Sequence, residues 1–145
     1  MTQADKDLLL KDLCGRIQYG VKFVIDNDQN NVRTLTGICE AIPYEDWQMC
    51  VFARGISAIP IEDIKPYLFP MSSMTEEQYY ELQTISGKDC LEHMEVEKEW
   101  RNNSSFSHLP LYEYRVIDFF DRNHFDYRGL IPMGLAIDAT ELNIY

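Results

Sequence analysis

The sequence lacks the features that most quickly assign a protein to a class. No apolar run approaches the roughly 18 residues that a membrane-spanning helix requires, so we expect no membrane partner. The seven glycines stand singly and form no glycine-rich phosphate loop. Serine pairs occur at 72–73 and 104–105, but neither lies in a G-x-S-x-G or S-x-x-K motif. P-loop nucleotide binding and serine-nucleophile catalysis are therefore disfavoured.

Cysteine is scarce and widely spaced. The four cysteines are Cys14, Cys39, Cys50 and Cys90, and no two form a C-x-x-C pair. Zinc sites and redox motifs need such close pairs, because a single turn must hold two thiolates. Met1 is followed by the polar stretch TQADKD, without the apolar region of a signal peptide. We therefore expect a cytoplasmic protein whose cysteines are reduced and partly buried, as small core residues.

Basic residues are also few. The chain has 13 Lys and Arg against 24 Asp and Glu, for a formal net charge of -11. A nucleic-acid binder must neutralise a dense row of phosphates with Lys and Arg. The acidic residues are spread among apolar ones and form no run, which is typical of an ordinary soluble surface. We therefore expect no nucleic-acid partner.

Apolar material is what the chain has in quantity. Of its 145 residues, 46% are hydrophobic and 12% aromatic, which is enough for a packed core and argues against disorder. The length fits one domain of ordinary size. We expect two parts, residues 1–70 and residues 71–145, packed together as one compact domain.

The first part predicts a short helix followed by strands. Residues 4–14 place acids in the first turn and Leu9 and Leu13 on one face, and Gly15 is positioned to end the helix. A helical turn is expected at 62–65, which nearby prolines keep short. Alternating apolar and β-branched residues predict strands at 21–25, at 32–42 with a bulge at Gly37, at 47–55, and around Ile59 and Ile61.

The second part predicts mainly helices. Thr75 and Gln78 form a capping-box pattern at the start of a helix. Residues 111–123 have the apolar spacing of another helix, and Asn123, its last residue, suits a left-handed position. Between these helices we expect a further helix at 88–101, where a strand is also compatible with the pattern, and a polar loop at 102–110.

Together these elements predict an α+β fold. Several short strands joined by tight turns, with a helical turn near the last of them, are typical of a small SH3-like barrel. An open β-meander fits the same pattern, but barrel closure would remove the exposed strand edges. We expect the barrel or meander in the N-terminal half and a mainly helical C-terminal half.

Two stretches carry a family resemblance: IPIEDIKPYLFPMSSMTEEQ at 59–78 and IDFFDRNHFDYRGLIPMGLAIDA at 117–139. They resemble a family of uncharacterised small proteins from gut Bacteroidetes genomes and from their phages or mobile elements. The similarity covers most of the chain and is weakest at 88–110. The sequence departs from the family pattern at Phe69, where Arg is common. The resemblance implies a bacterial or phage-related accessory protein, and it implies no activity, substrate or catalytic residue.

The stretch NHFDYRGLIPMGLAID at 123–138 gathers the most reactive residue types. On an extended segment His124 and Asp126 would point to one side. Asp121, one turn earlier, would then complete a metal site of a hydrolase. We favour a structural interpretation instead: His124 bonds the last carbonyls of the preceding helix, Arg128 pairs with Asp126 or Asp121, and the apolar residues that follow pack under the helix.

The connector IKPYLFPMSSM at 64–74 is the second candidate site. Its aromatic residues would suit a docking segment or the floor of a groove between the two parts. We favour the alternative that they join the two parts by internal packing, as apolar residues of compact chains usually do. The residues singled out for a binding role in the two candidate stretches are Tyr67, Phe69, His124, Asp126 and Arg128.

These observations favour a non-enzymatic binding or interaction protein with a protein or small-molecule partner and no cofactor. The alternatives are the metal-dependent hydrolase and a structural component of a phage assembly. The sequence contains no recognisable pairing of a nucleophile with a base, so we expect no enzyme. It carries no indication of an oligomeric state.

Overall fold

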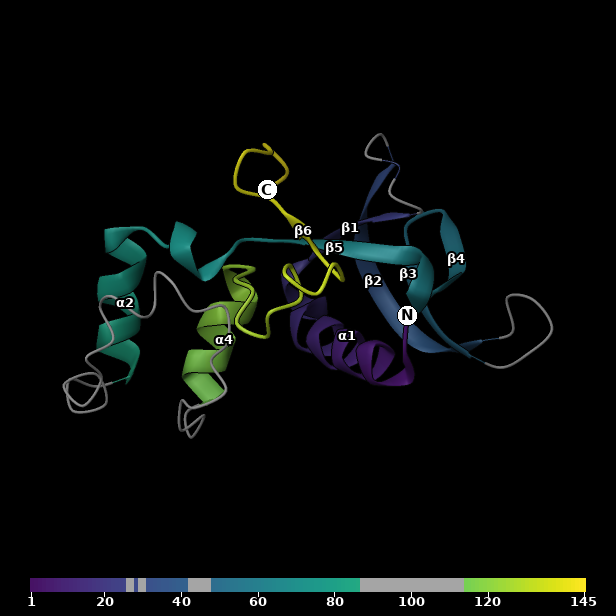
Figure 1. The fold of residues 1–145 in the computed structure, drawn as a ribbon, viewed down its shortest axis with the longest axis horizontal. Helices are drawn as coiled ribbons and strands as arrows, with labels where there is room; N and C mark the ends of the chain where they lie inside the picture. Colours follow the sequence, from purple (N-terminus) through teal and green to yellow (C-terminus); the bar gives the residue numbers. More distant parts are fainter. Residues whose placement is uncertain (26–27, 29–30, 42–47, 87–113) are drawn as a thin grey trace.

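A computed structural model describes the chain except for residues 26–27, 29–30, 42–47 and 87–113. In the part described, helices and one mixed sheet make up an α+β fold, as expected (Figure 1). The helices are α1 (Gln3–Arg16), α2 (Glu76–Ser86) and α4 (Tyr114–Arg122). The strands are β1 (Lys22–Ile25), β2 (Val32–Ala41), β3 (Gln48–Ala53), β4 (Ile56–Pro60), β5 (Ile64–Leu68) and β6 (Ile137–Asp138).

The sheet is open. Its strand order is β4-β3-β2-β1-β5-β6, with every pair antiparallel except β5–β6. The closed barrel that we expected is therefore wrong, and strands β1 to β4 form the alternative meander. A 3₁₀ turn at Ile61–Asp63, close to the predicted position, separates β4 from β5. Strand β5 then returns to pair with β1.

Strand β5 was not predicted: we expected a helical turn at 62–65, and a proline such as Pro66 is unusual in a central strand. The sheet accommodates this proline because β6 is only two residues long. Strand β6 pairs only with Tyr67 and Leu68 of β5. Pro66 is therefore paired with β1, where it lies opposite Phe23, and has no partner in β6. The missing amide therefore costs little, and the connector becomes part of the sheet.

The hairpin formed by β2 and β3 carries the bulge that Gly37 predicts. The pairing register shifts between Leu35 and Gly37, which places Gly37 opposite Phe52. Beyond the bulge the ladder is regular, and it brings Cys39 directly opposite Cys50. Two cysteines that are eleven positions apart in the sequence are therefore cross-strand neighbours.

Helix α1 begins at a capping box and runs past its predicted end. The Thr2 side chain accepts from the Asp5 amide, and the Asp5 carboxylate accepts from the Thr2 amide, which satisfies two orphan donors of the first turn. Gly15 lies inside the helix rather than ending it, and the helix extends to Arg16. Gly15 instead lies where α1 contacts Asp121 of α4.

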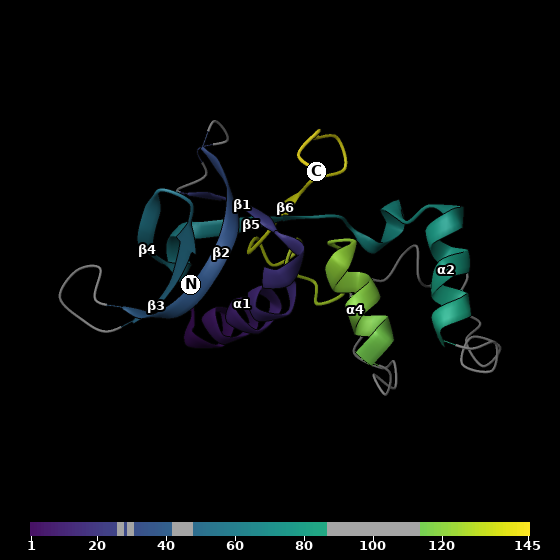
Figure 2. The same cartoon turned by 180° about the vertical axis from the view of Figure 1, so that it is seen from behind.

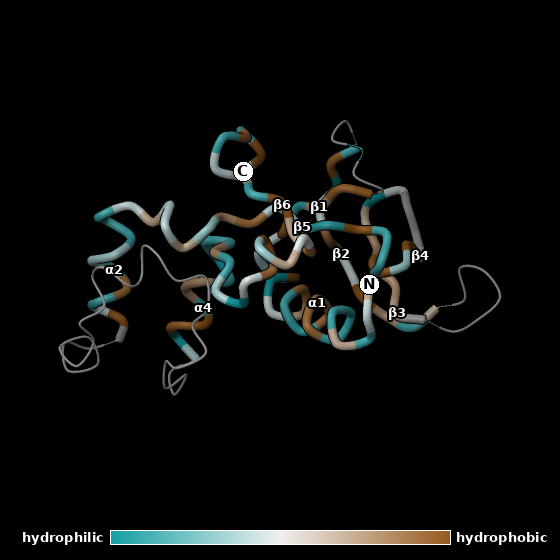
Figure 3. Tube along the Cα trace, in the orientation of Figure 1, coloured by the Kyte–Doolittle hydropathy of each residue, from teal (hydrophilic) through white to brown (hydrophobic). Residues whose placement is uncertain are grey.

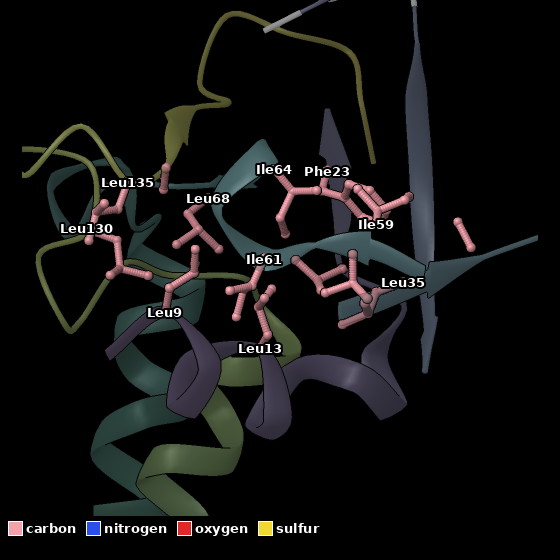
Figure 4. Packing of buried hydrophobic residues seen from close by; sticks show 14 residues of the cluster. Leu9, Leu13, Phe23, Leu35, Ile59, Ile61, Ile64, Leu68, Leu130 and Leu135 are labelled. Atoms are coloured by element: carbon pink, nitrogen blue, oxygen red, sulfur yellow. The ribbon is translucent and has the colours of Figure 1, made fainter. Parts of the chain in front are cut away.

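The main core lies between α1 and the sheet. Leu9 and Leu13 of α1 point at the strands and are fully buried (Figure 4). Leu130 and Leu135 enter the same cluster from the segment after α4. We expected this segment to pack under α4, which is wrong: it packs against the core that α1 and the sheet share.

Helices α2 and α4 lie side by side at one end of the molecule, with α4 nearer to α1 (Figures 1 and 2). Both alternate between hydrophilic and hydrophobic residues along the trace, as partly exposed helices do (Figure 3). Their shared apolar cluster contains Leu82, Phe119, Phe120 and Phe125. None of the described helices is long and apolar enough to cross a membrane.

The ends of these two helices follow the predictions in part. Thr75 and Gln78 form the expected capping box at the start of α2. The left-handed residue after α4 is His124, with φ of 57°, and not Asn123, whose side chain instead donates to the Phe119 carbonyl. The expectations for 88–101 and 102–110 lie outside the described residues.

Candidate functional site

Five buried side chains in the part described are polar or charged, and they converge where α1 meets the end of α4 and the loop after it. They are Asp12, Arg16, Asp121, His124 and Asp126. Together with the adjoining Tyr127 and Arg128 we call them the buried polar cluster. Burying charge is costly unless each group is paired, so the partners of each residue decide what this cluster can do.

Arg16 is the centre of the buried polar cluster. Its Nε and Nη2 donate to the two carboxylate oxygens of Asp12 at 2.7 and 2.9 Å, a bidentate pair one helical turn apart. Nη1 donates to the Phe120 carbonyl at 3.2 Å and Nη2 to the Phe125 carbonyl at 2.7 Å. Burial alone would lower the pKa of Arg16, but the charge and hydrogen bonds of Asp12, with Asp121, raise it overall. Arg16 therefore stays charged and ties α1 to the end of α4.

Asp121 approaches the same arginine more loosely. Its Oδ1 lies 3.8 Å from Arg16 Nη2. Burial raises the pKa of Asp121, and the positive charge of Arg16 offsets part of that rise. The Tyr127 hydroxyl makes no hydrogen bond of regular geometry in the described part, but it lies close enough to Asp121 to lower that pKa as well.

The contact between α1 and α4 explains Gly15. A β-carbon at this position would lie 2.5 Å from Oδ2 of Asp121, far inside van der Waals contact. Only a residue without a side chain lets the Asp121 carboxylate sit against the α1 backbone. The glycine is thus a requirement of close approach and not a helix stop.

This contact yields a prediction for Gly15→Ala. Alanine in a helix interior normally stabilises relative to glycine by up to about 1 kcal/mol. Here we expect a loss of about 1–3 kcal/mol in the free energy of unfolding, because the carboxylate must move from its place beside Arg16. Urea denaturation measures it. In an Asp121→Ala background the same change should be neutral or stabilising, and a loss that persists there would contradict the explanation.

Asp126 is engaged with backbone amides. Its two oxygens accept from the Leu130 amide at 2.7 Å and from the Ile131 amide at 2.8 Å. Burial raises the pKa of Asp126, and these two hydrogen bonds counteract part of the rise. The carboxylate therefore fixes the turn that leads from the loop into the main core.

Arg128 pairs with neither of its predicted partners. Its Nε lies 3.2 Å from Oδ1 of Asp12, and its guanidinium lies over the Tyr127 ring at 4.4 Å from the centroid. The expectation of a pair with Asp126 or Asp121 is wrong because the loop turns Arg128 toward α1. Asp12 thus faces two guanidinium groups, of Arg16 and Arg128.

His124 is held by stacking. Its ring lies 4.1 Å from the Tyr145 ring at an interplanar angle of 18°. Its Nδ1 has no hydrogen-bond partner within the described residues. This atom therefore does not make the expected hydrogen bond to the last carbonyls of α4. Burial, followed by the positive charge of Arg16, lowers the pKa of His124 to about 4. The imidazole is therefore neutral at physiological pH.

The connector residues Tyr67 and Phe69 lie beside this histidine. The Phe69 amide donates to the His124 carbonyl at 2.8 Å, and the Asp126 amide donates to the Phe69 carbonyl at 2.7 Å. The Tyr145 hydroxyl donates to the Tyr67 carbonyl at 2.8 Å, and burial raises the pKa of Tyr145 to about 12. Phe69 packs against the apolar cluster that α2 and α4 share. It also packs against a separate cluster that contains Val24, Tyr67 and Ala139. Phe69 therefore packs between the sheet and the helices, as in the joining role that we favoured, whereas Tyr67 packs against β1 and the C-terminal segment.

The chemistry left to the buried polar cluster is limited. The metal hypothesis requires free ligand atoms on His124, Asp126 and Asp121, but both carboxylate oxygens of Asp126 accept from backbone amides. Among the residues that the structure describes, no group of three or more His, Cys, Asp and Glu side chains could hold a metal ion. The arrangement is suited to holding elements together.

Sequence reasoning missed Asp12 and Arg16. A usable signal was present: residues 9, 12, 13 and 16 share one face of a helix, so the Asp12–Arg16 pair at i, i+4 lies on the face that buries Leu9 and Leu13. We placed the helix end at Gly15, and Arg16 was thereby left outside it. Extending the helix by one residue would have exposed the unusual pattern of a charged pair on an apolar face.

The fold and the buried polar cluster define an α+β protein with an internally paired ionic network. Comparisons with protein-family models, curated proteins and solved structures find no match to the chain. The resemblance to the gut Bacteroidetes and phage family therefore stays an expectation from the sequence.

Proposed function

We propose that the protein is a non-enzymatic binding protein whose partner is another protein. The observation that carries the proposal is the inward pairing of the buried polar cluster. Arg16, Asp12 and Asp126 are all engaged by each other or by the backbone. Groups held in this way stabilise a scaffold and leave recognition to the exposed surface. The strand order, with β5 returning to β1 after a 3₁₀ turn, is also compatible with an open SH3-like unit.

The outer face of α2 is the surface that we assign to the partner. Residues 76, 77, 80, 81 and 84 fall on one side of the helix and are all exposed. Tyr80 is 65% exposed, although a large aromatic side chain usually finds cover. Tyrosine is enriched at protein interfaces because it offers a large rigid contact area with a polar tip. Around it stand Glu76, Glu77 and Glu81.

The charge of this face indicates the chemistry of the partner. Three glutamates surround Tyr80, and the chain as a whole carries a net charge of -11. Glu81 is paired with Arg122 of α4, so Glu76 and Glu77 are the carboxylates more open to a partner. Complementary charge speeds encounter and favours the correct orientation of docking. We therefore propose a protein partner with a basic docking surface.

A charge-reversal experiment tests this assignment. The immobilised full chain, and its Glu76→Lys/Glu77→Lys variant, are incubated with lysate of the source organism, and the captured proteins are quantified by mass spectrometry. We expect one basic protein to be captured by the native chain and to fall about tenfold or more in the variant, because attraction becomes repulsion. Raising the salt concentration should weaken capture by the native chain.

The matched control is Asp7→Lys/Glu141→Lys, which changes the net charge equally at two exposed positions away from this face. It should capture the partner as the native chain does. Equal loss in both variants would show a general charge effect and would contradict the assignment to α2. The absence of any captured protein at micromolar concentration would contradict the binding proposal itself.

The two alternatives have distinct signatures. A phage structural component should self-associate. An apparent mass by light scattering that rises with protein concentration would support this alternative against a separate partner. If the protein is a metal-dependent hydrolase, adding a divalent metal should raise its melting temperature. The His124→Ala variant should not show this rise. The hydrolase has the weaker support of the two alternatives, because both carboxylate oxygens of Asp126 accept hydrogen bonds from backbone amides. The resemblance to phage and mobile-element proteins suits an accessory binding role.

A further inference from the structure

The cross-strand cysteine pair of the β2–β3 hairpin is separate from both the buried polar cluster and the α2 face. Cys39 and Cys50 are directly opposite in an antiparallel ladder, so their side chains leave the same face of the sheet. Residues opposite one another in such a ladder have Cα atoms about 4.5 or 5.5 Å apart. Both separations fall within the range of roughly 4.4–6.8 Å that a disulfide spans. Opposed β-carbons lie about 4.5–5.5 Å apart, so closing the bond requires them to approach by about 1–2 Å, to the disulfide mean of about 3.8 Å.

The two thiols differ in environment. Cys39 is exposed, and its Sγ donates to the Glu40 carbonyl at 3.2 Å. Cys50 is fully buried, and burial, followed by the proximity of Cys39 and Asp63, raises the pKa of its thiol. An oxidant from solution therefore meets Cys39 first, while Cys50 is protected from direct attack but lies next to it.

We propose that Cys39 and Cys50 are a redox pair, in which Cys39 reacts with a hydroperoxide and Cys50 then closes a cross-strand disulfide. This assignment goes beyond the proposed binding function and does not depend on it. Cys39 is the reacting residue and Cys50 the resolving residue, and the oxidant is hydrogen peroxide or an alkyl hydroperoxide.

The chemistry balances over two steps. The Cys39 thiolate attacks the terminal peroxide oxygen, a sulfur–oxygen bond forms and the oxygen–oxygen bond breaks. Hydroxide leaves from hydrogen peroxide, or alkoxide from an alkyl hydroperoxide, and takes up a proton to become water or an alcohol. The Cys50 sulfur then attacks the Cys39 sulfenic sulfur, a sulfur–sulfur bond forms, the sulfur–oxygen bond breaks, and the departing oxygen leaves as water with the thiol proton. The two thiols lose two electrons in total, and the peroxide gains them.

The disulfide would link the two strands near the end of the ladder where the chain passes from β2 to β3, two residue pairs from Ala41 and Gln48. It would close a short loop of sequence between residues 39 and 50, and closing a loop of this length restricts the unfolded chain. The oxidised protein should therefore be more resistant to unfolding than the reduced protein, and a thiol reductant should reverse the difference.

The test uses the full chain with Cys14→Ser and Cys90→Ser, which removes the other two thiols. After a slight molar excess of hydrogen peroxide we expect loss of both remaining thiols, a mass decrease of about 2 Da and a Cys39–Cys50 linked peptide. The melting temperature should rise by about 5–10 °C and return with dithiothreitol. In a Cys50→Ala variant of the same chain, the Cys39 sulfenic acid should persist and react with dimedone.

The matched control moves the exposed thiol by one residue. Cys39→Ser with Glu40→Cys keeps one exposed and one buried cysteine, but residue 40 lies opposite Met49 and points to the other face. This control should form no internal disulfide. Three results would overturn the proposal: a Cys39 that gains oxygen while Cys50 stays reduced, a disulfide between two chains, or no reaction of either thiol.

Discussion

Replacement of Arg16 by methionine should lower the free energy of unfolding by about 3–5 kcal/mol, because breaking a buried ion pair leaves an uncompensated charge. The side chain is fully buried and donates four hydrogen bonds. Methionine fills a similar volume but leaves the Asp12 carboxylate with Arg128 alone. It also leaves the Phe120 and Phe125 carbonyls without this donor. Urea denaturation followed by far-ultraviolet circular dichroism measures the loss.

Two further variants separate charge from packing in this experiment. Lys11→Met likewise replaces a basic residue by methionine, at an exposed position on the same helix, and should change stability by less than about 0.5 kcal/mol. Adding Asp12→Leu to Arg16→Met removes the stranded carboxylate and should recover part of the loss. If the double variant is less stable than Arg16→Met, the carboxylate is not the cause, and the ion pair does not have the role described.

Lowering the pH from 7.5 to 4.5 should destabilise the native chain by up to about 3 kcal/mol relative to a His124→Asn variant. The imidazole has a pKa of about 4 in the folded protein, against about 6.5 in the unfolded chain. Between these values the unfolded state binds more protons, so stability is fully present above pH 6.5 and is lost as the pH falls toward 4. Asparagine removes the titration and tolerates the left-handed conformation of residue 124.

The comparison between variants isolates His124 from the carboxylates. Asp121 and Asp126 have raised pKa values in the folded state, so they act in the opposite direction and favour folding as the pH falls. Both proteins contain them, and their effect cancels in the difference. The measurement is the free energy of unfolding of each protein across the pH range. A difference that stays constant with pH would show that the histidine titrates normally.

The sequence predicted most of the regular elements, because local patterns determine them. Alternation found strands β1 to β4, Gly37 indicated the bulge, and Thr75 indicated the start of α2. Strand β5 was missed because its proline is acceptable only where the neighbouring strand is too short to need an amide. That condition depends on β6, which lies about 70 residues further along the chain. No local pattern contains it.

The candidate site was half predictable. His124, Asp126 and Arg128 stood out because their residue types are conspicuous in a short stretch. Asp12 and Arg16 did not, because ending the helix at Gly15 left Arg16 outside it and hid the charged pair on the apolar face. The Asp12–Arg16 pair is buried because α4 packs closely against α1. This close approach is possible because Gly15 has no side chain. The glycine, read as a stop signal, was in fact the mark of that approach.

The long reach of Arg16 has a consequence for the order of folding. Its carbonyl partners, Phe120 and Phe125, lie 104 and 109 positions along the chain. Strands β1 to β4 pair with sequence neighbours and can assemble early, since local contacts close small loops. Helix α1 cannot bury its charged pair until the residues around 120–128 have been synthesised. During translation the charged pair of this helix must therefore stay uncovered until that segment is made, although Leu9 and Leu13 can already pack against the sheet.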